Sequence, residues 1–563
     1  MLVLTATVRM RCAPCPLLAL LLVVLPKPVA AQCEGKTVSA IVITTHRPSL
    51  VQVPRTLRPL AHVLGLEHTT TKADIIRRFL LVSVGRPCSA TQLAESERIL
   101  RLEPFLADVV VRAVADSLGG VRIEVETVDE ITTVFSMPFR RWRPAALLLG
   151  DGNVGGQAVY VAGNVQQGFA YRTGGGVQIV DYQVFGRPYT IALVANRAPL
   201  GSTLTLAFGH AFLTDLQRTG WHVGYSNVNA YTSFIRPDTG VVSLDVVRRF
   251  ADIGSVLRIG FGRRIGFLGG LLTYESVAPA AQAVVITDSG LVADPTAPIG
   301  GPLARYQNVR LNAVGGVRIL SFREVRGFDA LAAVQDVATG VQFGAVLGRG
   351  NDTFLSTDFY AGLGGARSFA AVRFEGEARY DPSVDRWDSM VASGRLAWYL
   401  KPSDAHLVIA SDEFSGGSRV RIPFQLALGA LPGGVRGYGN SRVVGAARSV
   451  TRLEERWSLG QCTRYVGLGL AGFADAGMVW AGGAPFGVTS GVKTGVGVGV
   501  LVAVPPQSKR LWRLDFAAPV SPDANARWEI RLTTSWVGGF WSEPTDVAQA
   551  RSGAAPSLIF TWP

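Results

Sequence analysis

The chain has 563 residues, of which 64 are glycine and 17% are charged, and its mean hydropathy is positive at +0.26. A helical membrane protein would show several continuous apolar spans of roughly 20 residues, and none follows the N-terminal segment. A soluble all-β enzyme shares the glycine content but rarely has so little charge. A transmembrane β-barrel, which distributes its apolar residues over alternating positions, fits this composition best.

Residues 1–31 are predicted to be a signal peptide. Arg9 and Arg11 form a basic start, residues 16–25 form an apolar core, and Val29-Ala30-Ala31 is a small-residue cleavage site. The alternative is an uncleaved anchor, for which the core is short. Cleavage would remove three basic residues and no acidic one, so the net charge would fall from +13 to +10.

The remaining positive charge is mostly arginine. The sequence has no basic helix and no basic run interleaved with aromatics, the features that would indicate binding of nucleic acid. A basic barrel lumen, or loops that face anionic lipopolysaccharide, explains the excess better, and a solvated excess without a partner is the alternative.

Two cysteines, Cys33 and Cys88, lie in a segment that a signal peptide would send to an oxidising compartment, where disulfides persist. They form a possible disulfide, but the sequence does not set the geometry, so the paired and the reduced forms both stay open. Cys12 and Cys15 would leave with the signal peptide, and Cys462 is interpreted as structural.

Residues 36–130 are predicted to form a small α+β domain. A β-branched strand at residues 38–44 is followed by an insertion to about Thr70, a helix over residues 71–82, and a second helix to Arg101 opened by a capping box at Ser89. A hairpin that turns at Gly119-Gly120 closes the domain. The expected order is therefore βααββ.

From residue 131 to 536 the chain repeats alternating segments of about ten residues separated by Gly, Pro, Asn and Asp turns, which is the pattern of a transmembrane antiparallel barrel. The count lies between sixteen and eighteen strands, because residues 140–200 and 254–325 hold long runs that fit either one tall strand or a hairpin.

Motif searches indicate no enzyme. The GxGxxG run at residues 467–472 lies within a strand and opens no helix, so it is interpreted as glycine packing. His46, His62 and His68 share the insertion but lack a fourth ligand and regular spacing, so we expect no metal. No cofactor is predicted either.

Residues 431–480 place an arginine in a glycine-rich loop and a carboxylate in the strand that follows. In that strand the period of two sends Phe473, Asp475 and Gly477 to one face and apolar residues to the other. A carboxylate facing a barrel interior needs a cation, and Arg436 is the predicted partner. Glu454 or Glu455 is the rival partner. Because we expect a wet lumen, the pair should cost less than one in a dry core.

The loop Val435-Arg436-Gly437-Tyr438 and the strand motif Phe473-x-Asp475-x-Gly477 resemble the BamA/TamA superfamily of outer-membrane proteins. The βααββ unit likewise resembles a POTRA domain, the periplasmic module of that superfamily. The resemblance implies sixteen strands, a loop anchored in the lumen through Arg436 and Asp475 with Tyr438 packed beside the arginine, and first and last strands that part for client strands.

The implied function is insertion or translocation of β-rich client proteins without nucleotide hydrolysis. The implied partners are outer-membrane lipid, unfolded barrel or secreted clients, and periplasmic chaperones or accessory subunits. One alternative is a two-partner-secretion pore, and another, from a different class, is a passive solute porin. The N-terminal domain could also be a passive plug of the barrel mouth.

The C-terminal extension, residues 537–563, departs from the family pattern, in which the chain ends on the last strand. Its apolar end, residues 558–562, is expected to bind within the lumen or across the seam. The alternative is that residues 558–562 are themselves the closing strand.

Overall fold

The computed structural model describes residues 33–47 and 70–551, with short gaps at 118, 138, 141–142, 168–172, 238–239, 262–263, 295–298, 300–304, 432, 464, 522, 524 and 526. The predicted signal peptide, His62, His68 and the apolar end at residues 558–562 lie outside the described residues.

The first described elements form a small unit with a three-stranded sheet in the order β1-β3-β2. β1 is parallel to β3 and β2 is antiparallel to it. Its elements are β1 (Val38–His46), α2 (Ala73–Arg78), α3 (Ala90–Leu102), β2 (Leu106–Ala115) and β3 (Val121–Asp129). This is the βααββ order that the sequence predicts. The two helices bury Ile75, Ile76 and Leu100 against the sheet.

Two details of the helices differ from expectation. α2 ends at Arg78, because the chain leaves the helix after Phe79 and the Leu81 N–H donates to Ser96 Oγ on α3 at 2.8 Å. Ser89 occupies the N-cap of α3, but its side chain makes no capping bond. The Glu34 carboxylate instead accepts from the Ala90 N–H at 2.8 Å. The capping-box prediction was therefore wrong: Ser89 does not accept from the Gln92 N–H, and a carboxylate distant in sequence meets another donor of the first turn, the Ala90 N–H.

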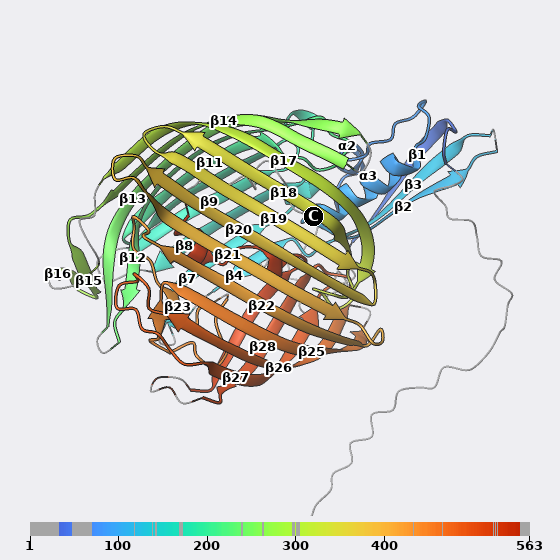
Figure 1. The fold of residues 1–563 in the computed structure, drawn as a ribbon. Helices are drawn as coiled ribbons and strands as arrows, with labels where there is room; N and C mark the ends of the chain where they lie inside the picture. Colours follow the sequence, from blue (N-terminus) through green and yellow to red (C-terminus); the bar gives the residue numbers. More distant parts are fainter. Residues whose placement is uncertain are drawn as a thin grey trace, which may run out of the picture.

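The rest of the described chain forms one closed antiparallel barrel (Figure 1). The wall strands are β4 (Thr133–Ser136), β7 (Ala146–Asp151), β8 (Val159–Gln167), β9 (Thr173–Asp181), β10 (Thr190–Ala198), β11 (Gly201–His210), β12 (Thr219–Ile235), β13 (Val241–Phe261), β14 (Arg264–Pro279), β17 (Tyr306–Arg326), β18 (Val334–Arg349), β19 (Thr353–Gly364), β20 (Ser368–Asp381), β21 (Arg386–Leu400), β22 (His406–Ser418), β25 (Ala447–Thr463), β26 (Val466–Trp480), β27 (Lys493–Ala503), β28 (Arg510–Pro519) and β29 (Glu529–Trp536).

Smaller elements lie at the ends of the wall. They are the hairpins β5 (Phe139–Arg140) with β6 (Arg143–Pro144) and β15 (Ala283–Thr287) with β16 (Gly290–Asp294), the pair β23 (Leu426–Ala427) and β24 (Val444–Gly445), the turns η4 (Val154–Gly156), η5 (Val184–Gly186) and η6 (Gly539–Trp541), and the helix α4 (Thr545–Ala548).

The barrel sheet of the described chain contains 22 strands, and β15 and β16 form a hairpin beside β13, which leaves twenty in the wall. The predicted sixteen to eighteen was therefore too low. The excess arises where the pattern was ambiguous: residues 146–198 fold as four strands of six to nine residues, β7 to β10, joined by short turns. Two short strands joined by a turn show the same alternation of apolar and polar residues as one tall strand, so the pattern alone does not give the number of strands.

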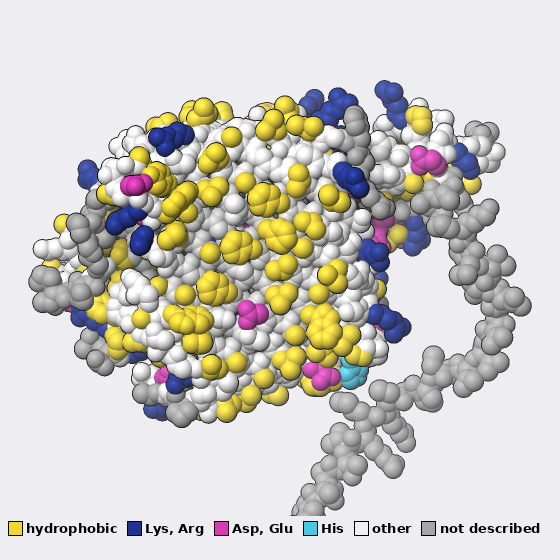
Figure 2. Space-filling view, in the orientation of Figure 1, with side chains coloured by type: hydrophobic (Ala, Val, Ile, Leu, Met, Phe, Trp, Pro, Cys, Tyr) yellow, Lys and Arg dark blue, Asp and Glu magenta, His cyan; other side chains and the backbone are white. Residues whose placement is uncertain are grey.

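Alternation sorts the wall into two faces. On β17, Asn308, Arg310 and Asn312 are buried toward the interior, whereas Val309 and Leu311 are 56% and 70% exposed on the outside. Figure 2 shows apolar side chains spread over the outer wall and lysines and arginines gathered near its two ends. The outer face is therefore suited to lipid. Within the described residues, no helix is both long and apolar enough to cross a membrane.

The N-terminal unit sits against one end of the barrel, here called the proximal end (Figure 1). Arg98 on α3 donates to the Leu213 carbonyl at 2.6 Å, and Arg101 pairs with Asp336 at 2.9 Å. In the turn between β9 and β10, Gln183 donates to the Ile75 carbonyl of α2 at 2.8 Å. The unit is thus fixed to turns and strand ends spread around the proximal mouth.

Candidate functional site: an arginine loop inside the barrel

We call the end of the barrel opposite the N-terminal unit the distal end. The connection between β22 and β25, residues 419–446, begins there and turns into the lumen, and we call it the lumen loop. Two glycines, Gly433 (φ 99°) and Gly437 (φ 91°), adopt the left-handed backbone that reverses the chain there. A Cβ on Gly437 would also lie 2.9 Å from the backbone of Ala518. The glycines therefore allow both the sharp turn and the close approach to the wall.

Arg436 grips Asp475 at three points. Its Nε and Nη2 donate to the two carboxylate oxygens at 2.8 and 2.7 Å, and its backbone N–H donates to Oδ2 at 3.1 Å. The Asp475 side chain is 0% exposed and that of Arg436 is 9% exposed. The site is thus much drier than the wet lumen expected from sequence, so loss of one partner leaves a largely unsolvated charge.

Arg436 contacts two of the three predicted carboxylates, because its Nη1 also donates to Glu454 Oε2 at 3.1 Å. The third, Glu455, lies 3.4 Å from His406 Nδ1 instead. Glu454 in turn accepts both Nη atoms of Arg513, at 2.8 and 2.9 Å. Arg513 also lies 3.2 Å from Asp515, and Arg456 contacts Glu454 through Nε. Three guanidiniums and three carboxylates therefore form one charge-balanced cluster on the inner faces of β25, β26 and β28 and the tip of the lumen loop.

An aromatic ring completes the arginine site. The Arg436 guanidinium carbon lies 3.4 Å from the centroid of the Phe473 ring. The stack is favourable for a flat, weakly hydrated guanidinium. Phe473 and Asp475 share one face of β26, as the period of two predicts.

Tyr438 anchors the loop in a different place from the one expected. Its hydroxyl donates to the Thr494 carbonyl at 3.0 Å and lies 2.8 Å from the Ser521 carbonyl. Thr494 is at the start of β27, and Ser521 lies in the connection between β28 and β29. The Tyr438 ring is buried with Val435, Val450 and Val479. The tyrosine therefore fastens the loop by a separate contact and does not simply pack beside Arg436.

Strand glycines make room for the loop. A Cβ on Gly477 would lie 2.6 Å from Val435 Cγ2, and one on Gly495 would overlap the Arg436 carbonyl oxygen. The glycine of the Phe473-x-Asp475-x-Gly477 motif is thus explained by steric contact with the lumen loop.

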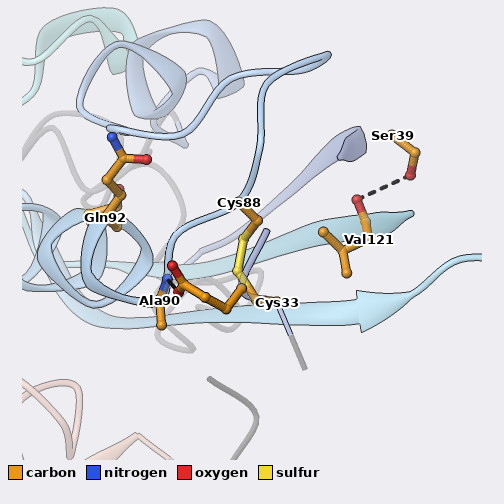
Figure 3. The surroundings of a disulfide bond; sticks show 8 residues. Cys33, Ser39, Cys88, Ala90, Gln92 and Val121 are labelled. Atoms are coloured by element: carbon orange, nitrogen blue, oxygen red, sulfur yellow. Dashed lines mark hydrogen bonds between the residues drawn. A yellow bond between two sulfur atoms is a disulfide. The ribbon is translucent and has the colours of Figure 1, made fainter. Parts of the chain in front are cut away.

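The disulfide candidate lies in the N-terminal unit, far from this cluster. Cys33 and Cys88 are bonded, with Cα atoms 5.6 Å apart, beside the start of α3 (Figure 3). Cys462 is a free, exposed cysteine. In the described part of the chain, no group of three or more His, Cys, Asp or Glu residues is arranged to hold a metal ion.

The wall closes where β29 meets β4. β4 has four residues and β29 has eight, so at most half of the β29 edge finds a partner in β4. The preceding junction, β28 with β29, pairs eight residues. The seam is therefore, with the four-pair ladder between β4 and β7, one of the two short ladders on either side of β4.

Sequence reasoning missed Arg513, Asp515 and Arg456. The first two stand at alternate positions on β28 and so share its inner face, which was a usable signal. What the sequence did not supply was the register that brings Arg513 opposite Glu454 across the intervening strands.

These features define a class: a closed antiparallel barrel with a small βααββ unit at one mouth and an arginine loop inserted in its lumen. No protein-family model and no curated protein matches the sequence. Solved structures that resemble the chain include BamA from Haemophilus ducreyi lacking POTRA domains 1-3, with 12% identity, a TM-score of 0.38, and coverage of 89% of this chain and 84% of that one.

CdiB from Escherichia coli is similar at 11% identity and a TM-score of 0.40, with 92% of each chain covered. CdiB from Acinetobacter baumannii is similar at 10% identity and a TM-score of 0.36, covering 88% of this chain and 73% of that one. At this identity the matches concern the fold alone, so the function is argued from the chain's own geometry.

Proposed function

We propose that this protein is an outer-membrane factor that inserts or translocates β-rich client proteins without nucleotide hydrolysis, with its N-terminal unit, residues 36–130, acting as a periplasmic POTRA domain. The supporting observation is the short seam between β4 and β29. Unpaired backbone groups at a strand edge pair readily with another strand, and in lipid they must be satisfied. Because β4 has only four residues and pairs with β7 at four positions as well, the wall on either side of β4 should open to a client strand at low cost, and opening at the seam exposes the longer β29 edge.

The arginine cluster supports the same proposal. It holds the lumen loop against the inner faces of β25, β26 and β28, and β28 is the neighbour of β29. Three balanced ion pairs stiffen the wall immediately before the seam. In this proposal the seam moves while the adjoining wall keeps its shape.

The N-terminal unit would supply the first contact with a client. β2 is an edge strand of its sheet, and an extended chain can add to such an edge through backbone bonds that do not depend on its sequence. The start of the other edge strand, β1, is covered by backbone, because Val38 exchanges backbone bonds with Gly85 and Arg86 at 2.9 and 3.0 Å. On β2 the Val109 and Val111 N–H groups donate to the side chains of Asp108 and Glu97 at 3.0 and 3.2 Å, which a client carbonyl can replace. We therefore expect β2 to be the client edge.

The proposal that the seam opens is tested by cross-linking β4 to β29. Pairs of cysteines, one from residues 133–136 and one from residues 529–536, are introduced into a Cys462→Ser chain, and the pair that cross-links is assayed for client insertion. We expect the oxidised form to lose insertion and reduction to restore it, with the Cys462→Ser parent treated identically as the control. A cross-linked barrel that inserts clients at the parent rate would refute the proposal.

A two-partner-secretion pore is the second candidate from the same superfamily. It requires passage through the lumen and not through the seam, so it predicts that the cross-linked barrel stays active. The passive porin is less well supported, because the lumen loop and residues 537–551 occupy the interior. Depletion of the protein, followed by comparison of outer-membrane and secreted proteins, identifies the client class.

A further inference from the structure

Residues 537–551, here called the C-terminal segment, leave the proximal end of β29 and run back into the barrel. The Val537 N–H donates to the Lys509 carbonyl at 3.1 Å, at the β27–β28 turn. The Gly538 N–H then donates to Asp329 Oδ2 at 2.8 Å, in the turn between β17 and β18. Gly538 is in the left-handed conformation, which turns the chain away from the wall.

In the middle of the lumen, two inward arginines hold one backbone carbonyl. Arg373 on β20 and Arg395 on β21 donate to the Trp541 carbonyl oxygen at 2.9 and 2.8 Å. The Trp541 ring meets the Tyr360 ring edge-on at 6.0 Å. A backbone carbonyl is common to every peptide, so this contact does not depend on sequence, whereas the aromatic contact does.

Further along, two carboxylates of the segment meet polar groups of the wall. Glu543 accepts from Ser393 Oγ at 2.9 Å, and Asp546 pairs with Arg448 at 2.7 Å. Val547, on the short helix α4, is 0% exposed and packs with Val391, Phe424 and Leu426. The Gln549 carbonyl accepts from Arg248 on β13. The segment therefore contacts wall strands on several sides of the barrel.

The C-terminal segment and the lumen loop also meet. A cavity of about 300 Å³ is lined by both, including Gly433 and Arg436 of the loop and Phe540 and Pro544 of the segment. Loop and segment enter from opposite ends of the barrel, so together they occupy its interior from the distal to the proximal side.

We propose that residues 537–551 are an internal plug, which occupies a lumenal binding track for an extended peptide carrying an aromatic residue and carboxylates. The plug contacts inward-facing side chains of the wall, Asp329 in a turn, and Phe424 and Leu426 of the lumen loop. None of these contacts belongs to a wall ladder, so the plug can leave without breaking one. The plug closes the lumen at rest. That a client segment of the same chemistry competes with the plug for the track rests on the proposed function. That the plug closes the lumen does not depend on it.

The first experiment measures ion conductance of the purified full-length barrel in planar bilayers, which needs no client. We expect a several-fold rise in conductance when the chain is ended after Trp536, and a rise in the same direction for the double variant Arg373→Gln with Arg395→Gln. Arg318→Gln is the matched control, because it removes another buried inward arginine whose bonds go to Gln342 and Asp215. Full-length conductance in both variants would overturn the proposal.

The second experiment covers the case in which the truncated chain does not assemble. Ser393→Cys and Glu543→Cys are placed in a Cys462→Ser background, so that oxidation ties the plug to β21. Lower conductance and fewer opening events when oxidised, with recovery on reduction and no response in the Cys462→Ser parent, support the plug. Unchanged openings in the oxidised form would overturn it.

A third measurement uses the barrel that ends after Trp536. It receives either a synthetic peptide with the sequence of residues 537–551 or a copy in which Trp541, Glu543 and Asp546 are alanine. We expect only the first to alter conductance of the truncated barrel, by restoring closure. Restored closure together with an inactive protein in client assays would refute the proposed function and leave the plug intact, so the two failures are distinguishable. Equal effects of the two peptides would refute the chemistry assigned to the track.

Discussion

At the scale of single residues, the arginine cluster is a balanced set of charges taken out of water. Arg436 lies between Asp475 and Glu454, and Arg513 shares Glu454 with it. A buried pair adds little net stability but is costly to break on one side, because the remaining charge is unpaired. The cluster therefore specifies where the lumen loop sits more than it stabilises the barrel.

Arg436→Ala should release the loop while the barrel still assembles. Loss of one partner of a buried pair costs about 3–5 kcal/mol, and here the cost falls on loop docking, since the wall ladders are untouched. We expect client insertion per assembled barrel to fall sharply. The measurement compares activity with assembled amount for Arg436→Ala, Asp475→Ala and the double variant.

In the double variant both members of the pair are absent, so the loss should be smaller than the sum of the two single losses. Arg436→Lys is the conservative comparison and should retain part of the activity, because an ammonium keeps the charge but loses the two-point grip. Full activity of both single alanine variants at normal abundance would show that the loop is dispensable.

Gly477→Ala tests the steric argument for the strand glycine. The new methyl would stand 2.6 Å from Val435 Cγ2 and 2.9 Å from the Ser449 carbonyl oxygen on β25. Both the loop and the wall must therefore shift, and client insertion per assembled barrel should drop. Val435→Ala removes the opposing methyl and should restore part of the activity in the double variant. If Gly477→Ala behaves like the parent protein, close loop packing is not needed.

At the scale of elements, the N-terminal unit is fixed to the barrel through buried polar groups at the β27–β28 turn. Lys509 Nζ lies 2.9 Å from the Glu103 carbonyl and also contacts the Arg101 carbonyl. Glu130 accepts from Ser508 Oγ at 2.7 Å. Burial lowers the pKa of Lys509 to about 8 and raises the pKa of Glu103 to about 8, although each charge moderates the shift of the other.

These shifts predict that docking of the unit is weakest near pH 8. The raised pKa of Glu103 makes its contribution complete below about pH 4.5 and lost as pH rises through about 8. Burial also raises the pKa of Glu130, which acts in the same direction. The lowered pKa of Lys509 makes its contribution complete above about pH 10.5 and lost as pH falls through about 8.

The pH dependence of docking can be measured by hydrogen exchange of α3 in the full-length protein from pH 5 to 10. The rates are corrected for the intrinsic exchange rate, and exchange should be fastest near pH 8. Glu103→Gln should flatten the acid arm and Lys509→Met the alkaline arm. A profile in the parent protein that changes in one direction only would contradict the assignment.

The disulfide of the N-terminal unit should contribute to its stability. Cys33 and Cys88 are separated by 55 positions, and loss of a native disulfide from a small domain costs about 2–5 kcal/mol. Replacing both cysteines by serine should lower the free energy of unfolding of the unit by this amount, measured by denaturant unfolding followed at the unit. Equal midpoints and slopes for variant and parent would show that the bond adds no stability.

At the scale of the whole molecule, apolar side chains are spread over the outer wall (Figure 2). The interior holds charged side chains and two inserted segments. We expect the mature protein to fractionate with outer membranes and to migrate differently in gels before and after heating, because a closed β-ladder resists detergent unfolding. Recovery as a soluble periplasmic protein would refute the membrane assignment.

The sequence by itself determined the features that follow from local periodicity. The period of two fixed the two faces of the wall, including the shared face of Phe473 and Asp475, and the glycine-rich loop identified the arginine that reaches them. The βααββ order followed from short runs bounded by turn residues. Each of these inferences needs only neighbours a few residues apart, which is the range over which backbone geometry correlates positions.

Tertiary structure alone decided what depends on register and on contacts between distant segments. The number of wall strands depends on where short alternating runs turn back. The choice between Asp475 and Glu454 is settled only by the position of the loop tip, where Arg436 contacts both. The sequence predicted that the end of the C-terminal extension binds in the lumen or across the seam, but not that the Trp541 carbonyl meets Arg373 and Arg395, more than a hundred positions earlier. Such contacts are selected by packing inside the closed barrel, which no local pattern encodes.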